Sequence, residues 1–218
     1  MNPERKAKLR QHPIERVSAW AGQIGSWIEG HLRFVGLGTS LILVVVVMVV
    51  GLSVYWSYER ESGLAAIRSG FVEMSNDQIE RAIPYFESAA DKLDGHARRL
   101  ALLKLGEAYE KQDQPGKALQ AYEGVLKNGS TEEAHYLVQF ALLRLGKAAE
   151  EEGDTELARS RYTEAAEIEG PGQLEALLAM AKILEQEDDG EGAKSYYRKY
   201  LDSEVNSPLK EVIEQKVD

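Results

Sequence analysis

The chain has 218 residues, a formal net charge of −10 and 44% hydrophobic residues, a length that allows one folded domain and an appendage. It has no cysteine, which excludes disulfides, thiolate metal sites and lipoprotein processing. Its acidity argues against nucleic acid as a partner.

Residues 1–33 form a basic N-terminal tail. They hold six basic and three acidic residues, so the tail carries +3 and the rest of the chain −13. Hydrophobic residues recur in the tail at helical spacing. They predict an amphipathic segment at a membrane interface, or a docking site for another membrane protein. These residues are Ile14, Val17, Trp20, Ile24, Trp27 and Ile28.

Residues 34–58 contain no charged residue and predict a single transmembrane helix. Such a helix is roughly 37 Å long, which exceeds a hydrocarbon core of about 30 Å. The valine-rich run 44–50 would weaken a helix in water, but in lipid only a helix satisfies the backbone. The segment is too long, and begins too late, for a cleaved signal peptide.

The charges beside this span predict its orientation. Six basic residues precede it, whereas Arg60 and Arg68 follow it and are offset by Glu59 and Glu61. We therefore expect a cytoplasmic N-terminus and residues 59–218 across the membrane. The charge asymmetry and the absence of cysteine fit a bacterial inner membrane, with the C-terminal part in the periplasm.

Residues 59–218 contain four copies of one spacing pattern. A small residue is followed twelve residues later by alanine, then after four by an aromatic residue and after three more by Ala, Val or Tyr. We expect the two small residues to let antiparallel helices approach, with the aromatic side chain beside the crossing. Turn-forming residues lie between the two halves of each copy. The small pairs are Gly70 and Ala82, Gly106 and Ala118, Gly146 and Ala158, and Ala181 and Ala193; the aromatic residues are Phe86, Tyr122, Tyr162 and Tyr197.

This pattern resembles that of tetratricopeptide repeats (TPRs), most clearly at 105–109 and 145–149. The resemblance implies an all-α fold with one transmembrane helix, a TPR-like solenoid of about four hairpins and a C-terminal capping helix at 209–217. The usual first-helix tryptophan is absent. The 40-residue step from the second to the third repeat, which runs through Asn128-Gly129-Ser130, predicts an extended loop or helix that bends the superhelix.

The architecture also resembles the ancillary subunit of the bacterial SecYEG translocon, through a cytoplasmic tail, one span and a periplasmic repeat domain. That likeness implies translocon subunits and exported or membrane proteins as partners. It rests on architecture and on no specific motif, and a fold alone does not assign function.

No residue pattern indicates catalysis, a cofactor or a metal. The four histidines are dispersed, and the acidic run 187–191 lacks the ligand register of an EF-hand. The glycine at 116 is not followed by the Ser or Thr of a phosphate-binding loop. We therefore expect a binding protein and not an enzyme.

TPR arrays bind partners along the face formed by the first helix of each hairpin, and the resemblance places ten residues on that face. They predict either a groove for an apolar or extended protein segment, or an inner core of the solenoid. The C-terminal helix or a symmetric dimer could also cover them. They are Leu64, Ile67, Phe71, Leu100, Leu103, Phe140, Leu143, Lys147, Leu178 and Lys182.

Two functions remain open on this evidence. The first is a membrane-tethered chaperone-like factor near the export machinery, which would bind many apolar clients. The second is a scaffold subunit of a fixed envelope complex, for respiratory-enzyme maturation or outer-membrane assembly, with one stoichiometric partner. The apolar residues favour the first.

Overall fold

The computed structural model describes the backbone of residues 3–127, 135–203 and 209–217, while many side chains between residues 3 and 41 lie outside the description. Contacts divide the chain into two units, Met1–Ser57 and Tyr58–Asp218. Within the described residues, all regular secondary structure is helical. The all-α prediction is thus confirmed.

Helix α1 (Pro3–Ser75) contains the predicted span and also the first helix of the repeats. Its part from Ile42 to Ser75 is long and apolar enough to cross a membrane, and the most apolar window of that part is unburied. The side chains of Ile24 and Trp27 in the tail are exposed. Those of Ile14, Val17, Trp20 and Ile28 lie outside the description, so the tail's amphipathic character stays a prediction.

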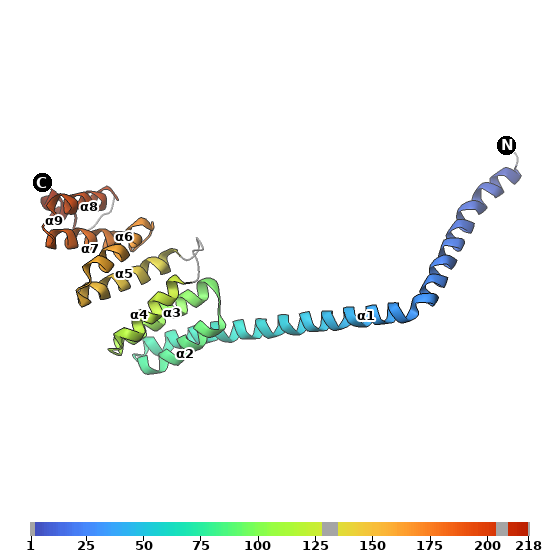
Figure 1. Cartoon of the computed structure of the whole chain (residues 1–218), viewed down its shortest axis with the longest axis horizontal. Coiled ribbons are helices and arrows are strands. Elements are labelled where there is room, and N and C mark those ends of the chain that lie inside the picture. The colour runs from blue at the N-terminus through green and yellow to red at the C-terminus, as the bar shows by residue number, and fades with distance from the viewer. Residues whose placement is uncertain (1–2, 128–134, 204–208, 218) are drawn as a thin grey trace. The chain divides into compact units, whose positions relative to one another are not determined.

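The end of α1 and the helices that follow form four antiparallel hairpins and a terminal helix (Figure 1). The end of α1 packs on α2, with Gly70 against the Phe86 ring. Helix α3 pairs with α4, α5 with α6, and α7 with α8, while α9 packs on α8. The helices are α2 (Ile79–Lys92), α3 (Gly95–Lys111), α4 (Pro115–Leu126), α5 (His135–Glu152), α6 (Thr155–Glu167), α7 (Gln173–Gln186), α8 (Gly190–Asp202) and α9 (Lys210–Val217).

Each hairpin turns through one residue with positive φ, as the turn-forming residues predicted. Asp77, Asp113 and Asp188 have φ of 59°, 55° and 61°, and Gly153 has φ of 80°. Aspartate tolerates this left-handed conformation better than most residues, and glycine adopts it freely. The next residue can then cap the second helix: Asp154 accepts a hydrogen bond from Leu157 N and Asp189 from Gly192 N.

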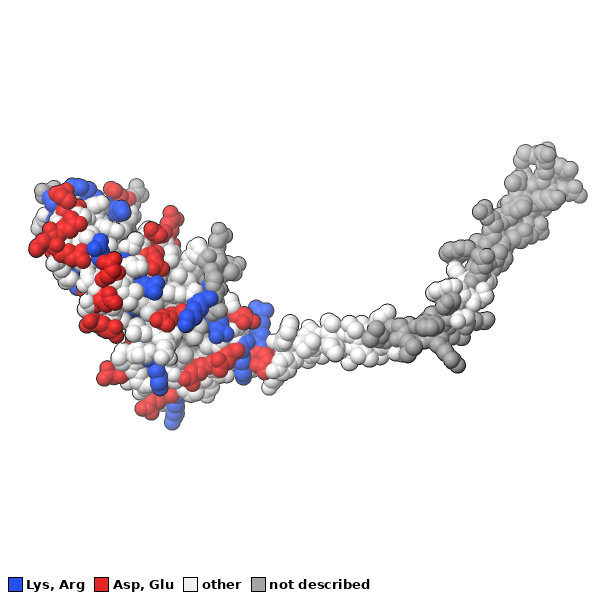
Figure 2. Space-filling view, in the orientation of Figure 1, with Lys and Arg blue, Asp and Glu red and all other residues white. Residues whose placement is uncertain are grey.

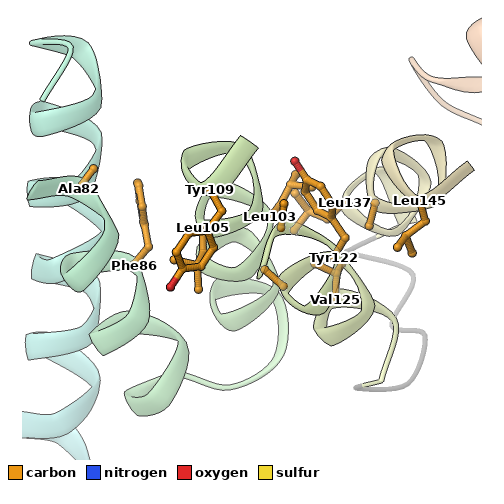
Figure 3. Close-up of a cluster of buried hydrophobic side chains, with 12 residues drawn as sticks. Ala82, Phe86, Leu103, Leu105, Tyr109, Tyr122, Val125, Leu137 and Leu145 are labelled. Atoms are coloured by element: carbon orange, nitrogen blue, oxygen red, sulfur yellow. The ribbon is translucent and has the colours of Figure 1, made fainter. Parts of the chain in front are cut away.

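The repeated glycine makes room for the aromatic ring, a closer relation than the helix crossing that the spacing suggested. A Cβ added to Gly70 would lie 2.7 Å from Phe86 Cε1, and one added to Gly146 would lie 2.7 Å from Tyr162 Cε1. Gly106 is crowded by Tyr122 in the same way. The ring therefore occupies the space of the missing side chain. Figure 3 shows Tyr122 of α4 between Leu103 of α3 and Leu137 of α5.

One buried glutamine fixes the connection between the third and fourth hairpins. The Nε2 atom of Gln139 donates to Ala165 O at 3.1 Å and to Ile168 O at 2.5 Å. Its Oε1 atom accepts a hydrogen bond from Gly172 N at 2.9 Å. All three contacts tie α5 to the chain that leads from α6 to α7.

Two predictions about the solenoid have different outcomes. The C-terminal helix is present as α9, with Ile213 buried beside Tyr197 and Tyr200 of α8. The bend predicted between the second and third repeats involves residues 128–134, which lie outside the described residues. The Asn128-Gly129-Ser130 segment belongs to that gap.

Candidate protein-binding surface

The side chains that project from the first helices of the hairpins change from apolar to charged along the solenoid. In the first repeat, Leu64 and Phe71 are 37% and 39% exposed. Phe71 packs edge-on against Phe86, with a ring-centroid distance of 5.7 Å, and Lys104 Nζ lies 5.9 Å from the centroid of its ring. We call this surface the first-helix face, and its exposed members are Leu64, Phe71, Glu110, Lys147, Lys182 and Glu185.

Three of the ten predicted contact residues lie in the core. Ile67, Leu103 and Leu143 are 7%, 5% and 4% exposed. Successive first helices contact each other, α3 with α5 and α5 with α7. Ile67, Leu103 and Leu143 each belong to one of the hydrophobic core clusters of the repeats. For these three residues the structure selects the inner-core interpretation and corrects the groove interpretation.

The other seven predicted residues retain some accessible surface. Leu64, Phe71, Lys147 and Lys182 are exposed. Leu100, Phe140 and Leu178 are half-buried, because each also packs against a core cluster. The apolar surface is therefore concentrated in the first repeat and does not extend along all four.

On the first-helix face, three glutamates form ion pairs that connect the later repeats. Lys182 Nζ of α7 lies 3.1 Å from Glu150 Oε1 of α5, and Lys216 Nζ of α9 lies 2.6 Å from Glu185 Oε1 of α7. Arg144 Nη1 of α5 lies 4.0 Å from Glu110 Oε2 of α3. We call Glu110, Glu150 and Glu185 the glutamate ladder, since each pairs with a basic residue of the next first helix or, for Glu185, of the terminal helix α9.

The aromatic residue of each of these repeats lies beside a ladder carboxylate. Tyr162 Oη donates to Glu150 Oε2 at 3.2 Å. The pKa of this phenol is raised mainly by burial and secondly by the Glu150 carboxylate. The pKa of Tyr122 is likewise raised mainly by burial and secondly by Glu110. At the end of the ladder, the hydrogen bond from Lys216 lowers the pKa of Glu185, and Glu185 raises the pKa of Lys216.

The first repeat has neither the glutamate nor the tyrosine of this arrangement. Phe86 occupies the tyrosine position, and Met74, twelve residues earlier, occupies the glutamate position. A ring without a hydroxyl needs no carboxylate, so the two changes match. Our sequence analysis did not relate Glu110, Glu150 and Glu185 to the tyrosines. The constant interval of twelve residues was the available signal.

Within the residues that the structure describes, no group of three or more His, Asp or Glu side chains could hold a metal ion. Figure 2 shows charged side chains of both signs spread over the repeat unit. Tyr136 Oη lies 3.1 Å from His96 Nε2, a contact that links α3 to α5. These contacts are of the kind that hold repeats together.

Comparisons with known proteins agree with this geometry. Residues 100–128 and 143–208 match the tetratricopeptide repeat family. A Pseudomonas aeruginosa pilF structure is similar with a TM-score of 0.55 and 19% identity, over 73% of this chain and 67% of that one. A structure of TPR-like repeats from Podosopora anserina has a TM-score of 0.52 and 15% identity, over 70% and 82%. No curated protein sequence matches the chain.

At these identities the two structures support the fold and nothing finer. The sequence matches cover most of the second and third repeats and all of the fourth. The hairpins of Tyr58–Asp218 thus form a TPR-like solenoid, and residues 100–128 and 143–208 within it match tetratricopeptide repeats.

Proposed function

We propose that the chain is a membrane-anchored, non-enzymatic binding protein that holds apolar segments of exported or membrane proteins near the protein-export machinery. The observation that carries the proposal is the exposed apolar pair Leu64 and Phe71 on the first-helix face. Isolated exposed apolar residues are common, but these lie together on one helix, in a repeat that has Met74 in place of the ladder glutamate and Phe86 in place of the tyrosine.

The anchor supports the same proposal. The apolar part of α1 leads without a helix break into the first repeat. We propose that it spans a bacterial inner membrane, with the N-terminus in the cytoplasm and the repeats in the periplasm, as the flanking charges predict. A single anchor raises the local concentration of the repeats beside a membrane-embedded partner.

A photo-crosslinking experiment tests the binding role. A photoreactive phenylalanine derivative at Phe71 is compared with one at Tyr85 of α2, because both side chains are 39% exposed. We expect the Phe71 probe to capture apolar segments of several exported or membrane proteins, and the Tyr85 probe to capture few. Equal capture at the two positions would contradict the proposal.

Quantitative mass spectrometry of the captured proteins separates the two functional classes. Translocon subunits together with a range of exported proteins would support the accessory role. One constant, stoichiometric set of other envelope subunits would instead identify a scaffold of a fixed complex.

The orientation has its own test. Because the natural chain has no cysteine, a single Ser75→Cys or Asn2→Cys variant introduces one labelling site. In intact spheroplasts, a membrane-impermeant maleimide should label the first variant and not the second. The reverse pattern would place the repeats in the cytoplasm.

A further inference from the structure

The first helix of each later repeat is covered by the second helix of the hairpin before it. Helix α2 packs on α3, α4 on α5 and α6 on α7, and consecutive helices run in opposite directions. The first hairpin lies at one end of the stack (Figure 1), and the chain before it continues α1 as the same helix. Within the described residues of Tyr58–Asp218, the repeats therefore supply no covering helix for α1.

An alanine that is buried in the later repeats is exposed in the first. Ala65 is exposed. Its counterparts at the same place in the repeat are each 0% exposed: Ala101, Ala141 and Ala176. Ala101 lies in a core cluster with Ala90 and Leu93 from the end of α2. The small side chain lets the covering helix approach, and the first repeat keeps it although no hairpin covers it.

Two further positions on α1 show the same difference. Val72 is 56% exposed, whereas its counterparts Ala108 and Ile183 in the second and fourth repeats are 0% and 1% exposed. Glu61 is exposed at the place where the third repeat has Leu137, which is 1% exposed. Four residues of α1 are spaced by four, three and four positions and so lie on one face of the helix. We call them the end stripe: Glu61, Ala65, Arg68 and Val72.

A hollow of about 570 Å³ lies over part of the end stripe. Glu61, Ala65 and Arg68 belong to its lining, and so does Leu64 of the first-helix face. All of its lining residues come from α1, so the hollow is open on its other sides. Such a surface suits the side chains of a second helix better than a small molecule, which binds in a concave pocket.

The charges of the end stripe favour a partner other than a second copy of the chain. Neither Glu61 nor Arg68 forms an ion pair with a described residue. Two copies anchored in one membrane and related by a two-fold axis would have parallel α1 helices, so Glu61 would face Glu61 and Arg68 would face Arg68. Like charges that face each other oppose association, whereas a partner with the opposite charges would neutralise both residues.

The place of the end stripe in the chain indicates where the partner lies. Glu61 follows Tyr58, the last residue of the proposed span, by three residues, or roughly 4.5 Å of helix. A helix that covers α1 in the opposite direction therefore runs toward the bilayer and can continue into it.

We infer that the end stripe binds one α-helix of a membrane-embedded partner protein, antiparallel to α1, in the place that the second helix of a preceding hairpin takes on the later repeats. This helix carries a basic side chain for Glu61 and an acidic one for Arg68. Its location beside the membrane rests on the proposed function, through the anchor, whereas the helical contact rests on the comparison of the repeats.

Photo-crosslinking at two positions of the end stripe tests the direction of this helix. A small amino acid with an aliphatic diazirine side chain is placed at Ala65 or at Val72 of the full-length chain in its native membrane. Mass spectrometry then locates the crosslinked residue of the partner. We expect both probes to capture one segment of one membrane protein. The residue captured from Val72 should precede the one captured from Ala65 by about seven positions, and a transmembrane span should follow.

Charge variants test how the helix is recognised. Glu61→Lys should lower the capture from Ala65 about fivefold, because a basic partner residue would then face a second base. Glu80→Lys is the control, since Glu80 is an exposed glutamate of the same hairpin that lies on α2, and it should leave the capture unchanged. An acidic substitution at the partner's basic residue nearest the captured position should restore the capture lost in Glu61→Lys. Both glutamates are exposed, so both variants should keep the helical circular dichroism of the natural chain.

Several outcomes would overturn the inference. These are no capture, capture of lipid alone, capture of a second copy of the chain, scattered captured positions in many proteins, the same residue order as on α1, or equal losses in the two glutamate variants. If the end stripe captures its helix but the Phe71 probe captures no more than the Tyr85 probe, the proposed client binding fails while this site stands. The reverse result would leave the client binding and remove this site.

Discussion

Gly106 shows how one missing side chain positions a neighbouring ring. The Tyr122 ring occupies the place of its Cβ, so Gly106→Ala would force the ring and the packed α3–α4 pair apart. An added methyl group in a tight core costs about 1–3 kcal/mol, more than the helix propensity that alanine restores. We expect a lower free energy of unfolding, measured by chemical denaturation followed by circular dichroism.

Gly116→Ala is the matched control for this change. A Cβ at Gly116 would meet no atom within 4 Å, and the residue lies in the first turn of α4. Its stability should equal or slightly exceed that of the natural chain. A Gly106→Ala protein as stable as Gly116→Ala would show that the ring moves freely. The fourth repeat has Ala181 at this place beside Tyr197, so some rearrangement is possible there.

For single residues, the sequence predicted the helix face more reliably than the burial of the side chain. The resemblance to TPRs placed Leu64 and Phe71 on the first-helix face, and it placed Ile67, Leu103 and Leu143 there as well. The last three are buried because neighbouring first helices contact each other, and the angle between hairpins decides that contact. A repeat pattern within one hairpin carries no information about this angle.

The connection between α6 and α7 depends on one side chain of α5. Gln139→Leu would keep a similar volume but leave Gly172 N and the carbonyls of Ala165 and Ile168 without their partner. Buried groups that lose a hydrogen-bond partner cost about 1–3 kcal/mol. We expect a loss within that range, together with faster amide hydrogen exchange in residues 168–172.

An exposed glutamine provides the comparison for this element. Gln120 of α4 is exposed, and Gln120→Leu should change the stability by no more than about 0.5 kcal/mol. Equal stabilities for the two variants would contradict the role given to Gln139.

The hairpins and turns could be predicted from their spacing and turn residues. The Gln139 contact could not, since it depends on the path of a connection that only the folded repeats define.

The tyrosines report on the solenoid as a whole. Burial and Glu87 raise the pKa of Tyr109 to about 12, and burial also raises the pKa of Tyr122, Tyr162 and Tyr197. A pKa that is higher in the folded state stabilises the fold below pH 10, and this stability is lost as the pH rises through the folded-state value. We therefore expect stability to fall between about pH 10 and 12.

Absorbance of phenolate during an alkaline titration measures this effect. Exposed tyrosines should ionise near pH 10, and the buried ones only at higher pH, together with the loss of helical circular dichroism. Ionisation of all ten tyrosines in one step near pH 10, with the helices intact, would contradict the burial described above.

The glutamate ladder has a mechanical consequence for the molecule. Two of its ion pairs each join two adjacent repeats, and the third joins the fourth repeat to α9, so each acts as a separate joint on one side of the stack. A rotation at the Glu110–Arg144 joint carries every later hairpin with it. The displacement of each later helix then grows with its distance from this joint, so a rotation of a few degrees there moves α9 the farthest.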